Sequence, residues 1–224
     1  SYVGSSFDQP VTSGEFSGLA VARILEGIRQ FNPKIKFYQA SSSEMFGSSK
    51  EVPQRETTTF SPQSPYAAAK VYGYHLTKIY RDGYNMFACN GMLFNHESPL
   101  RGLEFVSRKI TNGVAKIALG LEKNLYLGNL TSKRDWGYAP EYVEGMWKIL
   151  QQKSTDDYVL ATGESHSVLE FVKKSSERVD LNWKKYVKTD KKLFRVLEVD
   201  VLEGNTSKAK QKLQWKPKIT FDQL

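Results

Sequence analysis

Residues 35–44 read Ile35-Lys36-Phe37-Tyr38-Gln39-Ala40-Ser41-Ser42-Ser43-Glu44, an apolar stretch that ends in polar residues. The aromatic and β-branched side chains predict a strand over about 35–40. An alanine-rich segment over about 66–81 predicts a helix, and a second apolar run over 86–94 predicts the next strand. A strand, a long helix and a strand in this order predict a parallel βαβ unit, whose two strands end at the same edge of a sheet.

Capping signals mark where the predicted helices begin and end. Ser64 stands before a proline and is expected to cap the helix that follows, with Gly83 closing that helix. Thr12 and Glu15 have the spacing of a capping box, which predicts a helix over about 13–30. These signals predict one helix before the strand at 35–40 in the sequence and one helix after it.

Helix and strand continue to alternate along the rest of the chain. Further helices are expected near 104–119, 140–152 and 167–179, with strands near 124–127 and 158–161. The alternation predicts an α/β fold with a doubly wound parallel sheet, and no internal repeat or low-complexity linker interrupts it. Such sheets bind ligands where their strands end, so that edge is the first place to look for a site.

Composition and charge narrow the classes of protein. The 224 residues are 40% hydrophobic and 25% charged, without the apolar run of roughly 18 to 20 residues that a membrane span needs. The single Cys89 excludes an internal disulfide, and the first residues do not resemble a secretory signal, so we expect a cytoplasmic protein. We expect neither a metal site nor a membrane partner.

The net charge of +8 is local, because residues 173–218 hold 14 Lys and Arg against 6 Asp and Glu. The cluster fits an anionic ligand such as a nucleotide diphosphate, and it fits equally well a solvated face rich in lysine. No nucleic-acid-binding motif accompanies it, so we expect no nucleic-acid partner.

Tyr66 and Lys70 lie one helical turn apart and are predicted to share a face of their helix. A neighbouring ammonium favours the phenolate, so the pair is expected to lower the pKa of the tyrosine and to form an acid/base unit. A surface pair is the alternative, because this spacing often arises by chance. Ser42 and Glu44 follow the predicted strand and could approach the same point.

Several segments together resemble one family, the GDP-mannose 4,6-dehydratases of the extended short-chain dehydrogenase/reductases. The matching segments are Phe37-Tyr38-Gln39-Ala40-Ser41-Ser42-Ser43-Glu44-Met45-Phe46-Gly47, Ser64-Pro65-Tyr66-Ala67-Ala68-Ala69-Lys70, Leu93-Phe94-Asn95-His96-Glu97-Ser98-Pro99 and Lys133-Arg134-Asp135-Trp136-Gly137. The resemblance implies a partial Rossmann-like sheet with a smaller mixed α/β region. Residues 1–97 and about 137–163 would belong to the NADP-binding domain, and about 98–136 and 164–224 to the region that binds the GDP-sugar.

The resemblance also implies a reaction and the residues that carry it. Tyr66 would be the catalytic base and Lys70 its partner, Ser42 would bond the reacting hydroxyl, and Glu44 would act at C5 of the sugar. GDP-mannose would lose hydride from C4 to NADP⁺, lose water across C5 and C6, and regain the hydride at C6. The product would be GDP-4-dehydro-6-deoxy-mannose.

The family's binding residues fall on further positions of this sequence. NADP contacts are implied for Ser1, Tyr66, Lys70, His96 and Arg101, and GDP-mannose contacts for Asn95, Lys109, Arg134, Arg195 and Glu198. From the residues alone, His96 could be a packed loop histidine, and Lys109 and Arg134 could be surface charges. A homodimer or homotetramer is also implied.

Three departures from the family pattern stand out. Val196 replaces a proline that usually follows the arginine, so Arg195 is expected to sit on a more flexible loop. A tyrosine used near the cofactor is replaced around Thr12, and no glycine-rich phosphate-binding motif occurs in these residues. The chain therefore aligns to the part of the enzyme after that motif. A non-catalytic sugar-nucleotide-binding remnant and a related epimerase or reductase remain as alternatives.

Overall fold

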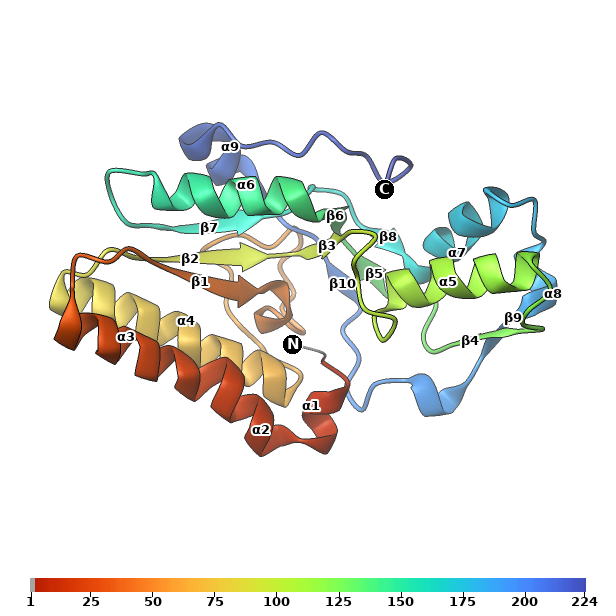
Figure 1. Ribbon diagram of the computed structural model, residues 1–224, viewed down its shortest axis with the longest axis horizontal. Helices are drawn as coiled ribbons and strands as arrows, with labels where there is room; N and C mark the ends of the chain where they lie inside the picture. The colour runs from red at the N-terminus through yellow and green to blue at the C-terminus, as the bar shows by residue number, and fades with distance from the viewer. Residues whose placement is uncertain (1–2) are drawn as a thin grey trace.

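Three parallel strands form the main sheet of the computed structural model, which describes residues 3–224. They lie in the order β1 (Phe37–Ser42), β2 (Ala88–Leu93) and β7 (Asp157–Leu160) (Figure 1). β1 and β2 pair in parallel over the full length of both strands. The predicted βαβ unit is confirmed, and its strands end at one edge, next to β3 (Asn95–Glu97).

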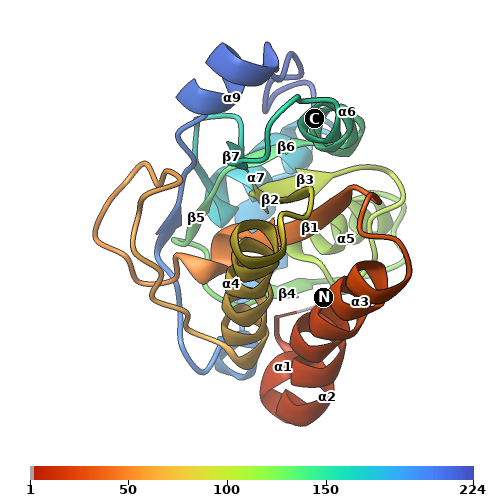
Figure 2. The same ribbon diagram turned by 90° about the vertical axis from the view of Figure 1, so that its left-hand side faces the viewer.

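Helices cover both faces of this sheet, as Figures 1 and 2 show. α3 (Ala20–Phe31) and α4 (Pro65–Tyr84) lie on one face, and α6 (Ala139–Leu150) and α9 (Ser207–Leu213) on the other. The apolar side of each helix packs on the buried strands, because burial of that surface is the main gain in free energy on folding. The prediction of a doubly wound α/β sheet is confirmed.

A second core lies beyond the carboxyl ends of the main strands (Figure 1). α5 (Val106–Ala118) and α7 (Val168–Glu177) pack together there, with α8 (Trp183–Tyr186) and the parallel pair β4 (Leu125–Leu127) and β9 (Val187–Thr189). Trp136 is buried at its centre. The carboxyl ends of the main strands therefore lie between the two cores.

Short elements complete the chain. They are α1 (Ser5–Asp8), α2 (Pro10–Gly14), the π-helical η1 (Glu15–Leu19), the 3-10 helices η2 (Ser43–Met45) and η3 (Lys191–Leu193), and the strands β5 (Lys133–Arg134), β6 (Trp136–Tyr138), β8 (His166–Ser167) and β10 (Val201–Leu202). β5 pairs with β10 and β8, and β6 pairs with β3, so these strands link the two cores.

One predicted cap is confirmed and another is wrong. The Ser64 hydroxyl accepts a hydrogen bond of 3.1 Å from the Ala67 amide at the start of α4. Thr12 caps nothing, because the helical segment already begins at Pro10 and runs on through η1 into α3. A proline suits the first turn of a helix, since its fixed φ is helical and its missing N–H would be unpaired there.

The predicted helix end at Gly83 is also wrong. α4 continues to Tyr84 and ends at Asn85, which adopts the left-handed conformation with φ of 53°. Asparagine tolerates this conformation better than most residues, so it can end a helix where glycine is expected. The helix predicted near 104–119 corresponds to α5 (Val106–Ala118), and Gly120 follows its end in the left-handed conformation, with φ of 71°.

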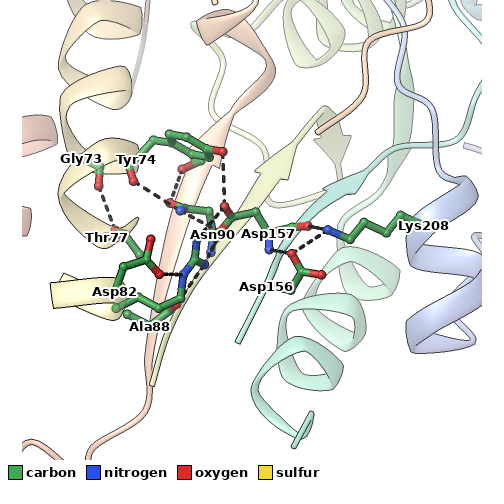
Figure 3. Close-up of polar contacts among 11 residues, drawn as sticks. Gly73, Tyr74, Thr77, Asp82, Ala88, Asn90, Asp156, Asp157 and Lys208 are labelled. Carbon is green, nitrogen blue, oxygen red and sulfur yellow. Dashed lines mark hydrogen bonds and ion pairs between the residues drawn. The ribbon is translucent and has the colours of Figure 1, made fainter. Parts of the chain in front are cut away.

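A buried polar network joins α4, β2 and β7 near the start of β7 (Figure 3). The Asp157 carboxylate accepts two bonds from the Arg81 guanidinium, at 2.8 and 3.1 Å, and two from Asn90, at 3.1 and 3.0 Å. The Tyr74 hydroxyl donates a further bond of 3.3 Å. Burial raises the pKa of Asp157, but the Arg81 and Asn90 bonds outweigh it and hold that pKa below its usual value.

Replacing Asp157 with alanine is expected to lower the free energy of unfolding of the complete protein by about 3 kcal/mol, because it strands a buried guanidinium. The Arg81 side chain is only 12% exposed. Urea unfolding measures the loss, and Asp156→Ala is the control, because its ion pair with Lys208 is more exposed and is worth roughly 0–1 kcal/mol. Equal losses in the two variants would contradict the assignment.

The same variant predicts a pH dependence. The pKa of Asp157 is lower in the folded state than the unfolded value of about 3.9, so its contribution to stability is fully present above that value. As the pH falls through the folded pKa, the carboxylate is protonated and the contribution is lost. The stability difference between the wild-type protein and Asp157→Ala should therefore shrink in acid below about pH 4.

Candidate active site

Ser42, Glu44 and Tyr66 meet where β1 ends. Ser42 is the last residue of β1, and its hydroxyl accepts a bond of 3.3 Å from the Glu44 amide, which caps η2. This turn keeps Glu44 beside Ser42, while the first turn of α4 brings in Tyr66. Both Glu44 and Tyr66 are buried. The structure thus brings these three side chains together, as expected, while their roles in a reaction stay a prediction.

The electrostatics around the Tyr66 phenol differ from the expectation. Burial raises the pKa of Tyr66, and the Glu44 charge raises it further. A hydrogen bond from Ser42 and the charge of Arg101 act in the opposite direction, but they do not outweigh burial. The prediction of a lowered pKa is therefore wrong for the protein chain by itself.

Lys70 shares a face of α4 with Tyr66, as predicted, but it does not bond the phenol oxygen. Its ammonium donates to the Ala40 carbonyl at 2.9 Å and lies 5.7 Å from the centre of the Tyr66 ring. Burial lowers the pKa of Lys70. The ammonium is thus fixed by the end of β1 at the rim of the Tyr66 site, and the pair is not a surface pair.

A hollow of about 150 Å³ opens beside Tyr66. Hydroxyl and amide side chains dominate its wall, which is formed by Ser5, Ser6, Gln9, Thr12, Ser13, Phe16, Ser17 and Tyr66. Thr12, where the sequence departs from the family pattern, therefore lines the hollow beside Tyr66. The polar residues of the first helices gave no recognisable signal in the sequence, and a role for them was not predicted.

His96 lies on β3, not in a loop. Its Nδ1 is 2.8 Å from the Phe94 carbonyl oxygen, and its ring stacks on Tyr142 with the centres 5.0 Å apart. Burial lowers the pKa of His96, and the charge of Arg101 lowers it further. His96 is therefore both a packed residue and a neighbour of the predicted site.

Arg101 is held by residues that sequence reasoning missed. Its Nε lies 3.0 Å from the Glu97 carboxylate, and its guanidinium carbon lies 3.6 Å from the centre of the Phe105 ring. Ser107 donates a bond of 2.6 Å to the same carboxylate. Burial raises the pKa of Glu97, whereas Arg101 and Ser107 lower it. The one sequence feature that could have identified Glu97 is its position next to His96 in a segment that resembles the family.

The residues predicted to hold the sugar nucleotide do not all reach the candidate site. Arg195 reaches the site directly, with Nη1 at 3.2 Å from a Glu44 carboxylate oxygen, and its amide donates to Glu198 at 2.9 Å. Asn95 begins β3 and is half-buried. Lys109 lies in α5, and the part of the chain that the structure describes gives its side chain no contact with the others.

Arg134 is not a surface charge, because it is only 5% exposed. Its guanidinium donates to the carbonyl oxygens of Lys133 and Val199, both at 2.8 Å. Burial lowers the pKa of Arg134, while the charges of Glu44 and Glu198 raise it. A guanidinium that is buried against carbonyl groups and still faces carboxylates can also face the phosphates of a ligand.

Asp135, next to it, is fully buried and ties three segments together. It accepts bonds from the Thr162 amide and hydroxyl, both at 2.7 Å, from the Gly163 amide at 2.9 Å and from the Gly204 amide at 3.3 Å. Burial raises the pKa of Asp135 although all four bonds lower it. It was quoted in the resembling segments, but no role was predicted for it.

A larger hollow, of about 320 Å³, lies elsewhere, between α7 and the C-terminal turn. Its wall includes His166 and Phe221, whose rings stack 3.9 Å apart, and none of the predicted site residues. The larger hollow therefore does not coincide with the predicted site residues. We take the site at Tyr66 as the candidate active site because the residues with acid/base chemistry lie there.

A family model described as GDP-mannose 4,6 dehydratase matches residues 1–224. The chain belongs to this family. The resemblance found in the sequence is thereby confirmed over its whole length. The chain is 50% identical over 243 residues to the GDP-mannose 4,6 dehydratase of Dictyostelium discoideum, and 51% over 228 residues to GDP-mannose 4,6 dehydratase 1 of Arabidopsis thaliana. The human GDP-mannose 4,6 dehydratase is 47% identical over 243 residues.

All of this chain is covered in each match, but only part of each relative. The share is 68% of the Dictyostelium protein, 63% of the Arabidopsis protein and 65% of the human protein. The chain thus spans about two-thirds of the length of these members of the GDP-mannose 4,6-dehydratase family.

Solved structures confirm the Rossmann-like fold. RMD from Pseudomonas aeruginosa, complexed with NADPH, has a TM-score of 0.89 at 19% identity, covering all of this chain and 75% of that one. The UDP-glucose 4-epimerase of Thermotoga maritima, with UDP-glucose, has a TM-score of 0.87 at 21% identity and is covered over 71% of its chain. In this dehydratase family member, no helix among the described residues is long and apolar enough to cross a membrane. Ser1, a predicted cofactor contact, lies outside the described residues.

Proposed function

We propose that the protein is an NADP-dependent GDP-mannose 4,6-dehydratase, which converts GDP-mannose to GDP-4-dehydro-6-deoxy-mannose. One observation carries the proposal: in a member of this family, Ser42, Glu44 and Tyr66 converge at the end of β1, with Lys70 beside them. This arrangement provides two acid/base groups for two different carbon atoms of one sugar.

The roles follow from the positions. Tyr66, beside Ser42, takes the proton of the sugar O4 hydroxyl while C4 is oxidised. Glu44 takes the proton at C5, which the neighbouring ketone makes acidic, and donates it to the C6 hydroxyl, which leaves as water. Ser42 orients the O4 hydroxyl between them. Both acids lie in a buried site, where each proton transfer is shielded from bulk water.

The residues present fit the nicotinamide end of a dinucleotide. The polar hollow beside Tyr66 suits a ribose and a carboxamide, and the Lys70 ammonium, 5.7 Å from the centre of the Tyr66 ring, would donate to ribose hydroxyls. Arg101 is near enough for its charge to lower the pKa of both Tyr66 and His96, so we place Arg101 and His96 at the cofactor as well. When bound, the cofactor supplies the reversible two-electron redox chemistry at C4 and C6. We propose NADP, rather than NAD, as the cofactor.

The two cores would then divide the work. Residues 1–97 and about 137–163 hold the cofactor, and about 98–136 and 164–224 hold the GDP-sugar. Arg134 and Arg195 face the diphosphate and Glu198 the ribose, while Asn95 and Lys109 complete the sugar side. We also propose a homodimer or homotetramer in the cytoplasm.

Product analysis tests the proposal. The complete protein, given GDP-mannose and NADP at well below the sugar concentration, should form the 6-deoxy-4-keto product without lasting accumulation of NADPH, followed by NMR and by absorbance at 340 nm. Formation of the C4 epimer, or consumption of NADPH, would instead assign an epimerase or a reductase. Binding of GDP-mannose without any conversion would support a non-catalytic binding protein.

A further inference from the structure

Arg195 and Glu44 form an ion pair across the candidate site, between residues 151 positions apart in the chain. Arg195 Nη1 lies 3.2 Å from one carboxylate oxygen and 3.4 Å from the other. The pair therefore joins the proposed base for C5 to an arginine that we place at the diphosphate. Neither residue can serve its proposed partner fully while this contact holds, because both carboxylate oxygens face the guanidinium.

The second arginine of the site is not part of this contact. Arg134 donates from Nη1 to the carbonyl oxygens of Lys133 and Val199 and is only 5% exposed, so its place is fixed whether or not a ligand is bound, whereas the Arg195 side chain is 32% exposed. In the part of the chain that the structure describes, Glu44 is the side chain that the Arg195 guanidinium contacts. Arg195 is thus the arginine that is free to change partners.

The loop of Arg195 also allows movement. Val196, the next residue, is 75% exposed, and no proline ring fixes φ at this point of the backbone. The Arg195 amide is anchored to Glu198, so the backbone can stay while the side chain swings. A diphosphate carries more negative charge than a carboxylate and offers oxygens that suit two guanidinium donors at once.

We propose that Arg195 couples substrate binding to release of the base: the diphosphate of a nucleoside diphosphate sugar draws Arg195 away from Glu44, which then faces the sugar. The inference rests on the proposed function, because it takes Glu44 as the base. Arg195 is in this respect a positioning residue. A nucleotide without a diphosphate would leave Glu44 paired and unavailable.

The coupling predicts that breaking the pair strengthens diphosphate binding. Calorimetry on the complete protein measures the dissociation constant of GDP. Glu44→Gln is expected to tighten GDP binding about three- to tenfold, since Arg195 no longer has to leave a carboxylate. In the background of Arg195→Gln, which itself weakens binding, the same change should alter affinity less than twofold, because the competing contact is already gone.

A shorter acid separates the ion pair from general charge repulsion. Glu44→Asp keeps the negative charge but withdraws it from Arg195, so it should also tighten GDP binding, by at least twofold, and it provides the test if Glu44→Gln does not fold. Unchanged or weaker binding in these variants, or equal tightening without Arg195, would overturn the coupling. A wild-type protein that binds no GDP would instead contradict the proposed function.

Discussion

Tyr66→Phe in the complete protein is expected to lower kcat for GDP-mannose at least about a hundredfold, which is the usual range for loss of a general acid/base. The phenol oxygen acts on a proton in the transition state, so the affinity for GDP-mannose should stay within about threefold of wild type. The ring itself remains, and the fold should tolerate the change because the lost atom bonds only within the site. Steady-state rates and calorimetry measure the two quantities.

Tyr72→Phe is the matched control, because it makes the same chemical change on an exposed position of the same helix. Its rate should equal that of the wild-type protein. The pH dependence provides a second check. Burial raises the pKa of Tyr66, so the active phenolate becomes more populated as the pH increases, and kcat/KM should rise from neutral to alkaline pH. Turnover of Tyr66→Phe within a few-fold of wild type would exclude the phenol as the base.

Glu44→Gln should separate the first half of the reaction from the second. Oxidation at C4 needs Tyr66 and Lys70, which the variant keeps, whereas elimination of water needs a group that takes the C5 proton. We therefore expect reduced cofactor to form and persist, seen as a stable absorbance at 340 nm, while formation of the 6-deoxy product falls at least about a hundredfold. In heavy water, deuterium should no longer enter C5.

A C4 epimerase or a reductase needs no acid/base at C5, so this variant distinguishes a dehydratase from these two kinds of relative. Glu164→Gln is the control, because that carboxylate is 78% exposed and lies outside the site. It should leave every step unchanged. If Glu44→Gln forms the 6-deoxy-4-keto product at nearly the wild-type rate, Glu44 is a structural carboxylate and another residue removes the C5 proton.

The order of strands and helices could be predicted because each signal is local. The strands predicted at about 35–40 and 86–94 and the helix predicted at about 66–81 follow from periodicity and capping, and the structure has them as β1, β2 and α4. The parallel pairing of β1 with β2 follows because a helix connects the two strands. The helix boundaries failed where a competing signal lay a few residues away, at Pro10 and at Asn85. Several residues near each boundary could start or end the helix, and the sequence alone does not show which of them does so.

The candidate site shows a different limit. Residues at the end of a strand, such as Ser42 and Glu44, could be expected to converge, because parallel strands end together. The Arg195 contact with Glu44, across 151 residues, and the burial of Arg134 depend on how the second core packs. The error in the pKa of Tyr66 has the same origin, since spacing on a helix reveals the neighbouring cation but not the desolvation of the phenol.

Asp135 has a mechanical consequence for the two cores. Its four bonds reach the loop after β7 and the turn at Gly204, while its own chain position joins β5 to β6. These four bonds add to the strand pairs that link the two cores, so a relative movement of the cores would have to keep this carboxylate in place or break several bonds at once. The Asp135 carboxylate thus crosslinks chain segments that are distant in the sequence and holds them together where the two cores join.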